Sequence, residues 1–247
     1  VAPSGRAMVF SQCGFLGRIE RLTAGGSERV PTGFQPGGAV YSRVGTVAYV
    51  RTGNTLVVQF ADGSRRDVLT VAEGALSALA FSPDGEQIAY HVTHPTTGGL
   101  FMVGIKSGLA NRLSDDPDDT SPVVLRDAVV FNRPGEDGQP ALMRVGLDGG
   151  GERVASPRPR IALDADPAGR VLTMTPARDH LYWFDPATGA EVPGPALDTP
   201  KAASTVHLSP DGRWLVALVG GSGRTVVRMP LDRAGAPLEV VRAMADD

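Results

Sequence analysis

The chain has 247 residues, of which 42% are apolar, and its formal net charge is −3. Acidic and basic residues are mixed along the chain without a basic patch interleaved with aromatic residues, which argues against nucleic-acid binding. Cys13 is the only cysteine, so a framework of internal disulfides is excluded. No apolar run reaches the ~20 residues that a membrane-spanning helix needs.

A short turn sequence repeats through the chain and predicts its fold. Ser82-Pro83-Asp84-Gly85 and Ser209-Pro210-Asp211-Gly212 are the clearest copies. The last residue of the turn recurs at intervals of 40, 40, 42, 42 and 43 residues, at Gly5, Gly45, Gly85, Asp127, Gly169 and Gly212. A period of about 40–45 residues, with strand-like segments between the turns, is typical of a β-propeller in which each period forms one blade. We therefore expect an all-β fold, a six-bladed propeller of four-stranded antiparallel blades, in one domain over residues 1–247.

The first unit, about residues 1–33, is incomplete. Ala2-Pro3-Ser4-Gly5 takes the place of the turn that follows a first strand. Three strand-like segments come after it, at Ala7–Ser11, Leu16–Leu22 and Glu28–Val30. We therefore expect the first blade to lack its inner strand, and we interpret the chain as part of a longer protein whose upstream residues supply that strand.

Each of the other five units predicts four short strands that are rich in β-branched and aromatic residues and separated by polar turns. These units span about residues 39–72, 76–115, 120–157, 160–197 and 204–244. The unit that begins near residue 76 is the clearest, because its turn has proline to preset φ, aspartate to bond the backbone and glycine to accept a positive φ. Its four strands are expected at Leu76–Phe81, Glu86–Val92, Gly99–Ile105 and Asn111–Ser114.

The clearest turns also carry a family resemblance. Phe81-Ser82-Pro83-Asp84-Gly85 followed by Ile88-Ala89-Tyr90 resembles the repeat of the TolB-type propeller, a WD40-like family with a Ser-Pro-Asp-Gly turn. Leu208–Ala217 follows the same pattern, and Arg112-Leu113-Ser114 followed by Asp119-Thr120-Ser121-Pro122 resembles that family's passage between blades. The resemblance implies a six-bladed bacterial propeller, periplasmic or otherwise extracytoplasmic, that binds proteins or peptides. A cytoplasmic propeller fused to a sensor protein is the alternative.

The up-and-down strand order places the connections on two opposite faces. The first-to-second and third-to-fourth turns share one face, here called the turn face. The second-to-third loops and the connections between blades share the other, the loop face, where the segments are longer and more variable. Function concentrates in such loops, so we expect a protein or peptide partner over the loop face. The candidate partner-binding residues are His94, Asp118, Asp119, Arg133, Asp137, Arg158, Arg160 and Arg178.

Several candidates have a simpler interpretation. The run of four aspartates at 115–119 has enough carboxylates for a divalent cation. Because the EF-hand spacing is missing, a solvated connection in which Asp119 caps the next strand explains the run better. His94 is either a ligand and pH sensor or an exposed loop residue. Arg158 and Arg160 either hold a carboxylate of the partner or are simply exposed.

The candidate residues do not predict a catalytic set. No Gly-x-Ser-x-Gly nucleophile elbow occurs, no histidine lies close to Cys13 in the sequence, and His91 and His207 are expected to pack or hydrogen-bond within strands. We therefore predict no catalytic residue, no metal and no cofactor.

The preferred function is a non-enzymatic protein- or peptide-binding scaffold or sensor. It is expected to be a monomeric domain of a larger chain, with no nucleic-acid partner and no membrane span. The alternatives are a propeller that gates a serine peptidase or holds a channel metal in a hydrolase, and a spacer without a ligand.

Overall fold

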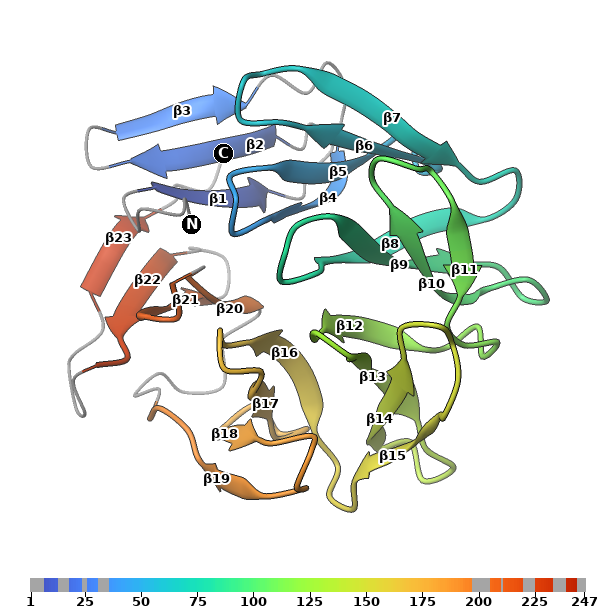
Figure 1. Ribbon diagram of the computed structural model, residues 1–247. Helices are drawn as coiled ribbons and strands as arrows, with labels where there is room; N and C mark the ends of the chain where they lie inside the picture. The colour runs from blue at the N-terminus through green and yellow to red at the C-terminus, as the bar shows by residue number, and fades with distance from the viewer. Residues whose placement is uncertain are drawn as a thin grey trace.

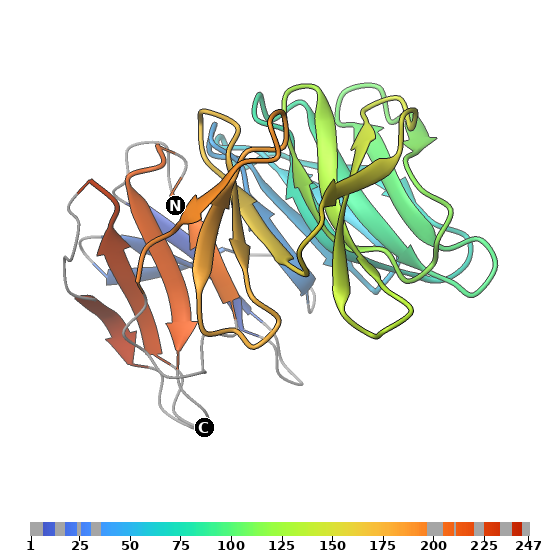
Figure 2. The ribbon, with the colours of Figure 1, turned by 90° about the horizontal axis from the view of Figure 1, so that it is seen from below.

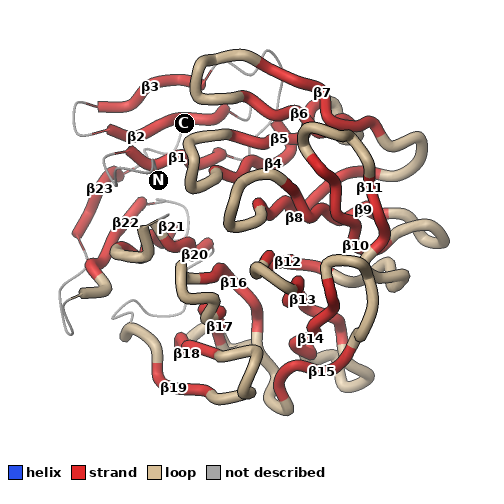
Figure 3. The backbone as a smooth tube through the Cα atoms, viewed as in Figure 1, coloured by secondary structure: helices blue, strands red, loops and turns tan. Residues whose placement is uncertain are grey.

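The computed structural model describes residues 7–12, 18–23, 26–30, 36–196, 205–209, 211–219, 225–232 and 239–243. Within these ranges the chain forms strands and turns and no helix (Figure 3), and no helix able to span a membrane is found among them. Figure 1 shows the strands gathered into sheets that are arranged as a ring. Figure 2 shows the same sheets from the side, with their connections at the two faces of the ring.

The described residues form twenty-three strands in chain order. They are β1 (Ala7–Gln12), β2 (Arg18–Thr23), β3 (Gly26–Val30), β4 (Pro36–Tyr41), β5 (Val47–Arg51), β6 (Thr55–Gln59), β7 (Arg65–Thr70), β8 (Ala75–Phe81), β9 (Gln87–Thr93), β10 (Gly99–Gly104), β11 (Ala110–Arg112), β12 (Thr120–Val124), β13 (Ala128–Pro134), β14 (Pro140–Gly146), β15 (Arg153–Ser156), β16 (Ile161–Ala165), β17 (Val171–Met174), β18 (Leu181–Phe184), β19 (Glu191–Pro193), β20 (Thr205–Leu208), β21 (Trp214–Val219), β22 (Thr225–Pro230) and β23 (Glu239–Ala243).

Consecutive strands pair antiparallel, so each sheet is an up-and-down meander. Five sheets have four strands, namely β4–β7, β8–β11, β12–β15, β16–β19 and β20–β23, and one sheet has three, β1–β3. The prediction of a propeller with four-stranded antiparallel blades is confirmed. The number of blades is corrected, because the structure completes five four-stranded blades and not six. The physical reason lies in the first sequence unit, which contains only three strand-like segments and therefore builds a three-stranded sheet.

The four strands predicted for the unit that begins near residue 76 are found in the structure as β8–β11. Each end of β8, β9, β10 and β11 falls within two residues of its predicted place. The largest difference is at the outer strand, where β11 ends at Arg112 and Ser114 lies beyond it. Ser114 instead accepts a hydrogen bond from the Leu100 N–H through its hydroxyl, at 3.2 Å.

Apolar side chains fill the seams between neighbouring blades. Residues of the β4–β7 and β8–β11 blades share one cluster, which includes Leu56 and Ile88. Those of the β8–β11 and β12–β15 blades share another, which includes Leu100 and Phe131. The second strand of each of these blades is buried on both sides, as the burial of successive residues in β5, β9 and β13 shows. The sequence of a strand that is buried on both faces is a continuous apolar run, without alternation of apolar and polar residues.

The Ser-Pro-Asp-Gly turn is stabilised by its own side chains. The buried Ser82 hydroxyl donates to Asp84 Oδ1 at 2.5 Å and accepts the Gln87 N–H at 2.9 Å. Asp84 Oδ1 also accepts the Glu86 N–H at 2.9 Å, and Gly85 has φ +75°. The second copy repeats the serine–aspartate bond between Ser209 and Asp211 at 2.5 Å. The hydroxyl of Ser82 and the N–H of Glu86 lower the pKa of the Asp84 carboxyl.

The turn geometry makes a pH-dependent prediction. Replacing Ser82 by alanine removes the donor to Asp84, so the pKa of Asp84 should rise toward its ordinary value of about 3.9. Because the folded-state pKa is depressed, the carboxylate stabilises the fold above about pH 4, and this contribution is lost as the pH falls through the folded-state pKa. Carbon-13 NMR titration of the carboxyl groups measures the change, and Asp62, whose hydroxyl donor is Ser64, is the internal reference. An unchanged Asp84 pKa in Ser82→Ala would contradict this assignment.

Two Asp-Gly turns between third and fourth strands offer a matched test of the seams. Gly149 and Gly63 have φ +86° and +84°, so alanine suffers the same left-handed strain at both. A Cβ on Gly149 would lie 2.5 Å from the Arg112 carbonyl oxygen of the preceding blade, whereas a Cβ on Gly63 meets nothing within 4 Å. Gly149→Ala should therefore lose ~1–3 kcal/mol more unfolding free energy than Gly63→Ala. Urea unfolding measures the unfolding free energy of both variants. Equal losses would contradict the prediction, because they would mean that the Arg112 carbonyl moves aside without cost.

Candidate functional site

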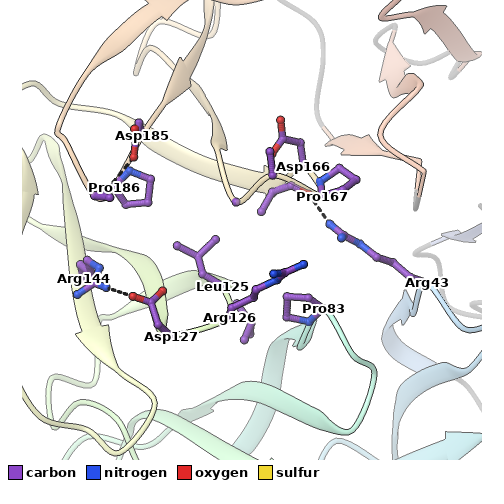
Figure 4. A pocket seen from close by; sticks show the side chains of 15 residues that line it. Arg43, Pro83, Leu125, Arg126, Asp127, Arg144, Asp166, Pro167, Asp185 and Pro186 are labelled. Atoms are coloured by element: carbon purple, nitrogen blue, oxygen red, sulfur yellow. Dashed lines mark hydrogen bonds and ion pairs between the residues drawn. The ribbon is translucent and has the colours of Figure 1, made fainter.

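A pocket opens on the turn face, at the centre of the ring (Figure 4). Its volume is about 430 Å³, within the range of small-molecule and peptide-anchor sites. Turns from four successive blades build its wall. The lining residues are Arg43 of the β4–β5 turn, Pro83 of the β8–β9 turn, Val124–Asp127 and Arg144 of the β12–β15 blade, and Ala165–Gly169 with Asp185–Ala187 of the β16–β19 blade.

Three arginines line the pocket, and they differ in how they are bonded. Arg43 donates to the Ala165 carbonyl oxygen at 3.0 Å, so its side chain reaches from the β4–β7 blade to the β16–β19 blade, with two blades between them on the ring. Arg144 donates to Asp127 Oδ2 at 2.7 Å, and its buried Nε has no hydrogen-bond partner in the described structure. Arg126 is exposed at the tip of the β12–β13 turn and makes no hydrogen bond or ion pair with any residue that the structure describes.

The three aspartates of the pocket are already engaged. Asp127 accepts from Arg144, and the buried Asp166 accepts from Arg170 at 2.7 Å. Asp185 accepts the Ala187 N–H at 2.8 Å and the Thr188 hydroxyl at 2.8 Å, and these bonds lower the pKa of its carboxyl. The carboxylates therefore have internal donors, while the donors of Arg126 remain open.

Arg133 and Asp119, both predicted to bind a partner on the loop face, instead bind each other. Arg133 donates from Nε and Nη2 to the two Asp119 oxygens, at 2.7 Å each, and Asp119 is completely buried. Arg133 also donates to Glu152 at 2.7 and 3.0 Å and lies 3.3 Å from Asp116. The hydrogen bonds that Arg133 donates to Asp119 raise the pKa of its guanidinium. Burial raises the pKa of the Asp119 carboxyl, and the bonds from Arg133 oppose that rise.

Arg158 and Arg160 both bind one carboxylate of the protein itself, although only Arg160 is buried and Arg158 is exposed. Both donate to Glu191 of β19, Arg158 at 2.9 Å and Arg160 through two bonds at 2.8 and 2.9 Å. The guanidinium of Arg160 also lies 4.3 Å from the centre of the Tyr182 ring, and this side chain is buried. The structure thus ties four of the eight predicted residues into two ion-pair groups within the chain.

The other four predicted residues lie in separate loops. Asp118, Asp137 and Arg178 are exposed, and Arg178 has φ +58° in the β17–β18 loop. Asp137 accepts the Gln139 N–H at 2.9 Å within its own loop. His94 Nδ1 accepts the Thr97 N–H at 3.1 Å, and its Nε2 lies 3.5 Å from Glu73. Partner binding by these loop-face residues stays a prediction.

The histidine of β9 has a hydrogen-bonding role, as expected. The buried His91 contacts the Ser77 hydroxyl through Nδ1 and the Pro117 carbonyl oxygen through Nε2, both at 2.9 Å. Among the described residues, no group of three or more histidine, cysteine, aspartate or glutamate side chains is placed to hold a metal ion.

Sequence reasoning missed the pocket on the turn face. Aligned on Gly85, Arg43 takes the place of Pro83 and Arg126 takes the place of Asp84. These departures from the Ser-Pro-Asp-Gly pattern are the signal that marks the two pocket arginines, since a broken local rule often accompanies a functional site.

Solved structures share the architecture. TolB from Acinetobacter baumannii matches with a TM-score of 0.67 and 16% identity over 92% of this chain and 61% of that one. A puromycin-hydrolyzing peptidase of Mycobacterium tuberculosis matches with a TM-score of 0.62 and 18% identity over 96% of this chain and 45% of that one. An oligogalacturonate lyase in complex with manganese matches with a TM-score of 0.66 and 14% identity over 98% of this chain and 75% of that one.

These likenesses show a TolB-like propeller fold. The chain spans less than two thirds of the length of TolB and of the peptidase. No family model matches the chain, and no curated protein matches it. Because TolB, a peptidase and a lyase share the architecture, function has to be argued from the site.

The Arg133–Asp119 pair yields a stability prediction. Arg133→Met keeps the aliphatic stem near the Phe131 ring but leaves the buried Asp119 without its cation, so the unfolding free energy should fall by about 3–5 kcal/mol. Adding Asp119→Asn removes the unpaired charge, and the double variant should be more stable than Arg133→Met alone. Urea unfolding measures both, with Arg66→Met on the exposed part of β7 as control. A double variant less stable than Arg133→Met would contradict the assignment.

Proposed function

We propose that this propeller is a non-enzymatic binding module that receives a peptide or a segment of a protein partner over the turn-face pocket. The observation that carries the proposal is Arg126, an exposed cation in a cavity of about 430 Å³ that has no partner among the described residues. On the loop face, by contrast, Arg133 and Arg160 already donate hydrogen bonds to Asp119 and Glu191. A partner gains more from open donors than from donors that must first break internal bonds.

The chemistry of the pocket supports binding over catalysis. Its charged groups are arginines and internally bonded aspartates, and its other side chains include Pro83, Pro167 and Pro186. Rigid prolines and short turns form a wall that needs little ordering when a ligand enters, which favours affinity. A nucleophile with an adjacent base, the arrangement that covalent catalysis requires, is not among the residues that line this pocket.

The same proposal includes a compartment and an alternative. An extracytoplasmic location rests on the TolB-like architecture, with a cytoplasmic sensor fusion as the other arrangement. A propeller that gates a serine peptidase is the alternative function, supported by the match to the propeller-containing part of a peptidase. A hydrolase domain beside this propeller in the full reading frame would favour that alternative.

Tryptophan substitutions on the two faces test where a partner binds. Ala168 is exposed and lines the pocket, so Ala168→Trp should obstruct it. Glu136→Trp places the same bulk on the exposed β13–β14 loop of the loop face. Peptides selected from a random display library against the wild-type chain should bind Glu136→Trp normally and Ala168→Trp about tenfold more weakly, a loss of ~1.4 kcal/mol in binding free energy.

Isothermal titration calorimetry measures the affinities, and circular dichroism verifies that both variants fold. The reverse pattern would overturn the turn-face proposal and support the loop-face prediction instead. Failure to select any specific peptide would count against the function as a peptide-binding module.

A further inference from the structure

We infer that the turn-face pocket is a carboxylate site, in which Arg126 and Arg43 together hold the carboxylate of a bound peptide. The inference deepens the proposed function and rests on it, since it names the group that the partner presents. The carboxylate is either a chain terminus or an aspartate or glutamate side chain, and the apolar neighbours of that group lie against Pro83 and Pro167.

The two guanidinium groups enter the pocket from opposite sides. Figure 4 shows Arg126 and Arg43 pointing toward each other between Pro83 and Pro167. Arg126 comes from the β12–β13 turn and Arg43 from the β4–β5 turn, so the two charges are held by blades that are not neighbours. An anion between two such groups receives donors from both, and the planar arginine fork matches the geometry of a carboxylate.

Arg43 already shows which bond the ligand would replace. Its Nη2 donates to a neutral acceptor, the Ala165 carbonyl oxygen, at 3.0 Å. The Ala165 carbonyl oxygen carries no charge, whereas a carboxylate adds the attraction of opposite charges and accepts two parallel bonds from a guanidinium. A carboxylate therefore competes well for Arg43, and for Arg126 it displaces only water.

The acidic neighbours do not neutralise these two arginines. Asp127 bonds to Arg144, Asp166 bonds to Arg170, and Asp185 bonds to its own turn. Arg144 is the third arginine of the wall, but Asp127 pairs with its charge and its unbonded Nε is buried. Arg126 and Arg43 are thus the pocket arginines that have no carboxylate partner among the described residues.

Small peptides with and without a carboxylate test the inference directly. The probes are acetyl-Ala-Ala with a free C-terminus, its C-terminal amide, acetyl-Asp-amide and acetyl-Asn-amide. Titration of the full chain is followed by nitrogen-15 NMR of the arginine Nε–H groups. At least one carboxylate probe should give saturable shifts at Arg126 and Arg43, its uncharged counterpart should not, and the probe that binds identifies the source of the carboxylate.

Charge-matched variants separate a site from general attraction. Arg126→Gln should weaken the binding of the carboxylate probe by about tenfold or more, and Arg126→Lys should lie between it and the wild type because lysine keeps the charge but loses the fork. Arg66→Gln removes one positive charge from the exposed part of β7 and should bind like the wild type. Equal weakening by Arg126→Gln and Arg66→Gln, or no binding of either carboxylate probe, would overturn the inference.

The outcomes also separate this inference from the proposed function. If display selection yields peptides that need the pocket but carry no carboxylate, the binding module stands and the carboxylate site is overturned. If the carboxylate probes bind through Arg126 but none of the longer peptides from the display library binds, the carboxylate site stands and the peptide-binding function fails.

Discussion

Each four-stranded sheet of this protein has two apolar faces, and only a neighbouring sheet on each side can cover both. The clusters that include Leu56 with Ile88 and Leu100 with Phe131 are the result, because each joins two successive blades. The ring follows from this requirement, since a sheet stacked at an end would leave one apolar face in water. The packing of sheet against sheet also determines where the turns of distant blades meet.

The seams are completed by arginines that lie near aromatic rings and reach carboxylates or carbonyls. Arg133 and Arg160 lie 5.6 and 4.3 Å from the rings of Phe131 and Tyr182 and are bonded to Asp119 and Glu191. Such side chains cover the polar edge of an apolar seam while their stems stay in contact with it. This role explains why charged residues on the loop face resemble a binding surface in the sequence but are engaged internally in the fold.

The sequence predicts the strands and turns well because their determinants are local. The Ser82–Gly85 turn is specified by bonds between residues no more than five apart, such as the one from the Gln87 N–H to the Ser82 hydroxyl. The pairing of Arg43 with Ala165 spans 122 residues and exists only after the blades that carry the two residues have packed into place. The same holds for Arg160 and Glu191, which are 31 residues apart. A sequence pattern therefore places these side chains on a face but cannot say which of them already have partners.

Two of the turns around the pocket lack hydrogen bonds that stabilise the Ser-Pro-Asp-Gly turn. In the intact turn, Ser82 and Asp84 satisfy the backbone and each other. The turn of the preceding blade keeps its serine, because the Ser42 hydroxyl accepts the Thr46 N–H at 2.9 Å, but Val44 stands where the aspartate would be. Arg43 stands at the proline position, and its side chain extends across the pocket to the Ala165 carbonyl oxygen.

The β12–β13 turn departs further, since it has neither the serine nor the aspartate and is closed by the Leu125 N–H bond to the Ala128 carbonyl oxygen at 2.8 Å. Its tip carries Arg126, which contributes nothing to the turn itself. Two turns of one repeat have thus given up local stabilising bonds, and in both cases an arginine enters the same pocket. Arg43 gains a bond to Ala165, whereas Arg126 gains no bond to any described residue. A residue that departs from the local pattern without a structural gain is the kind expected to be retained for a ligand, and Arg126 therefore favours the turn face as the binding face.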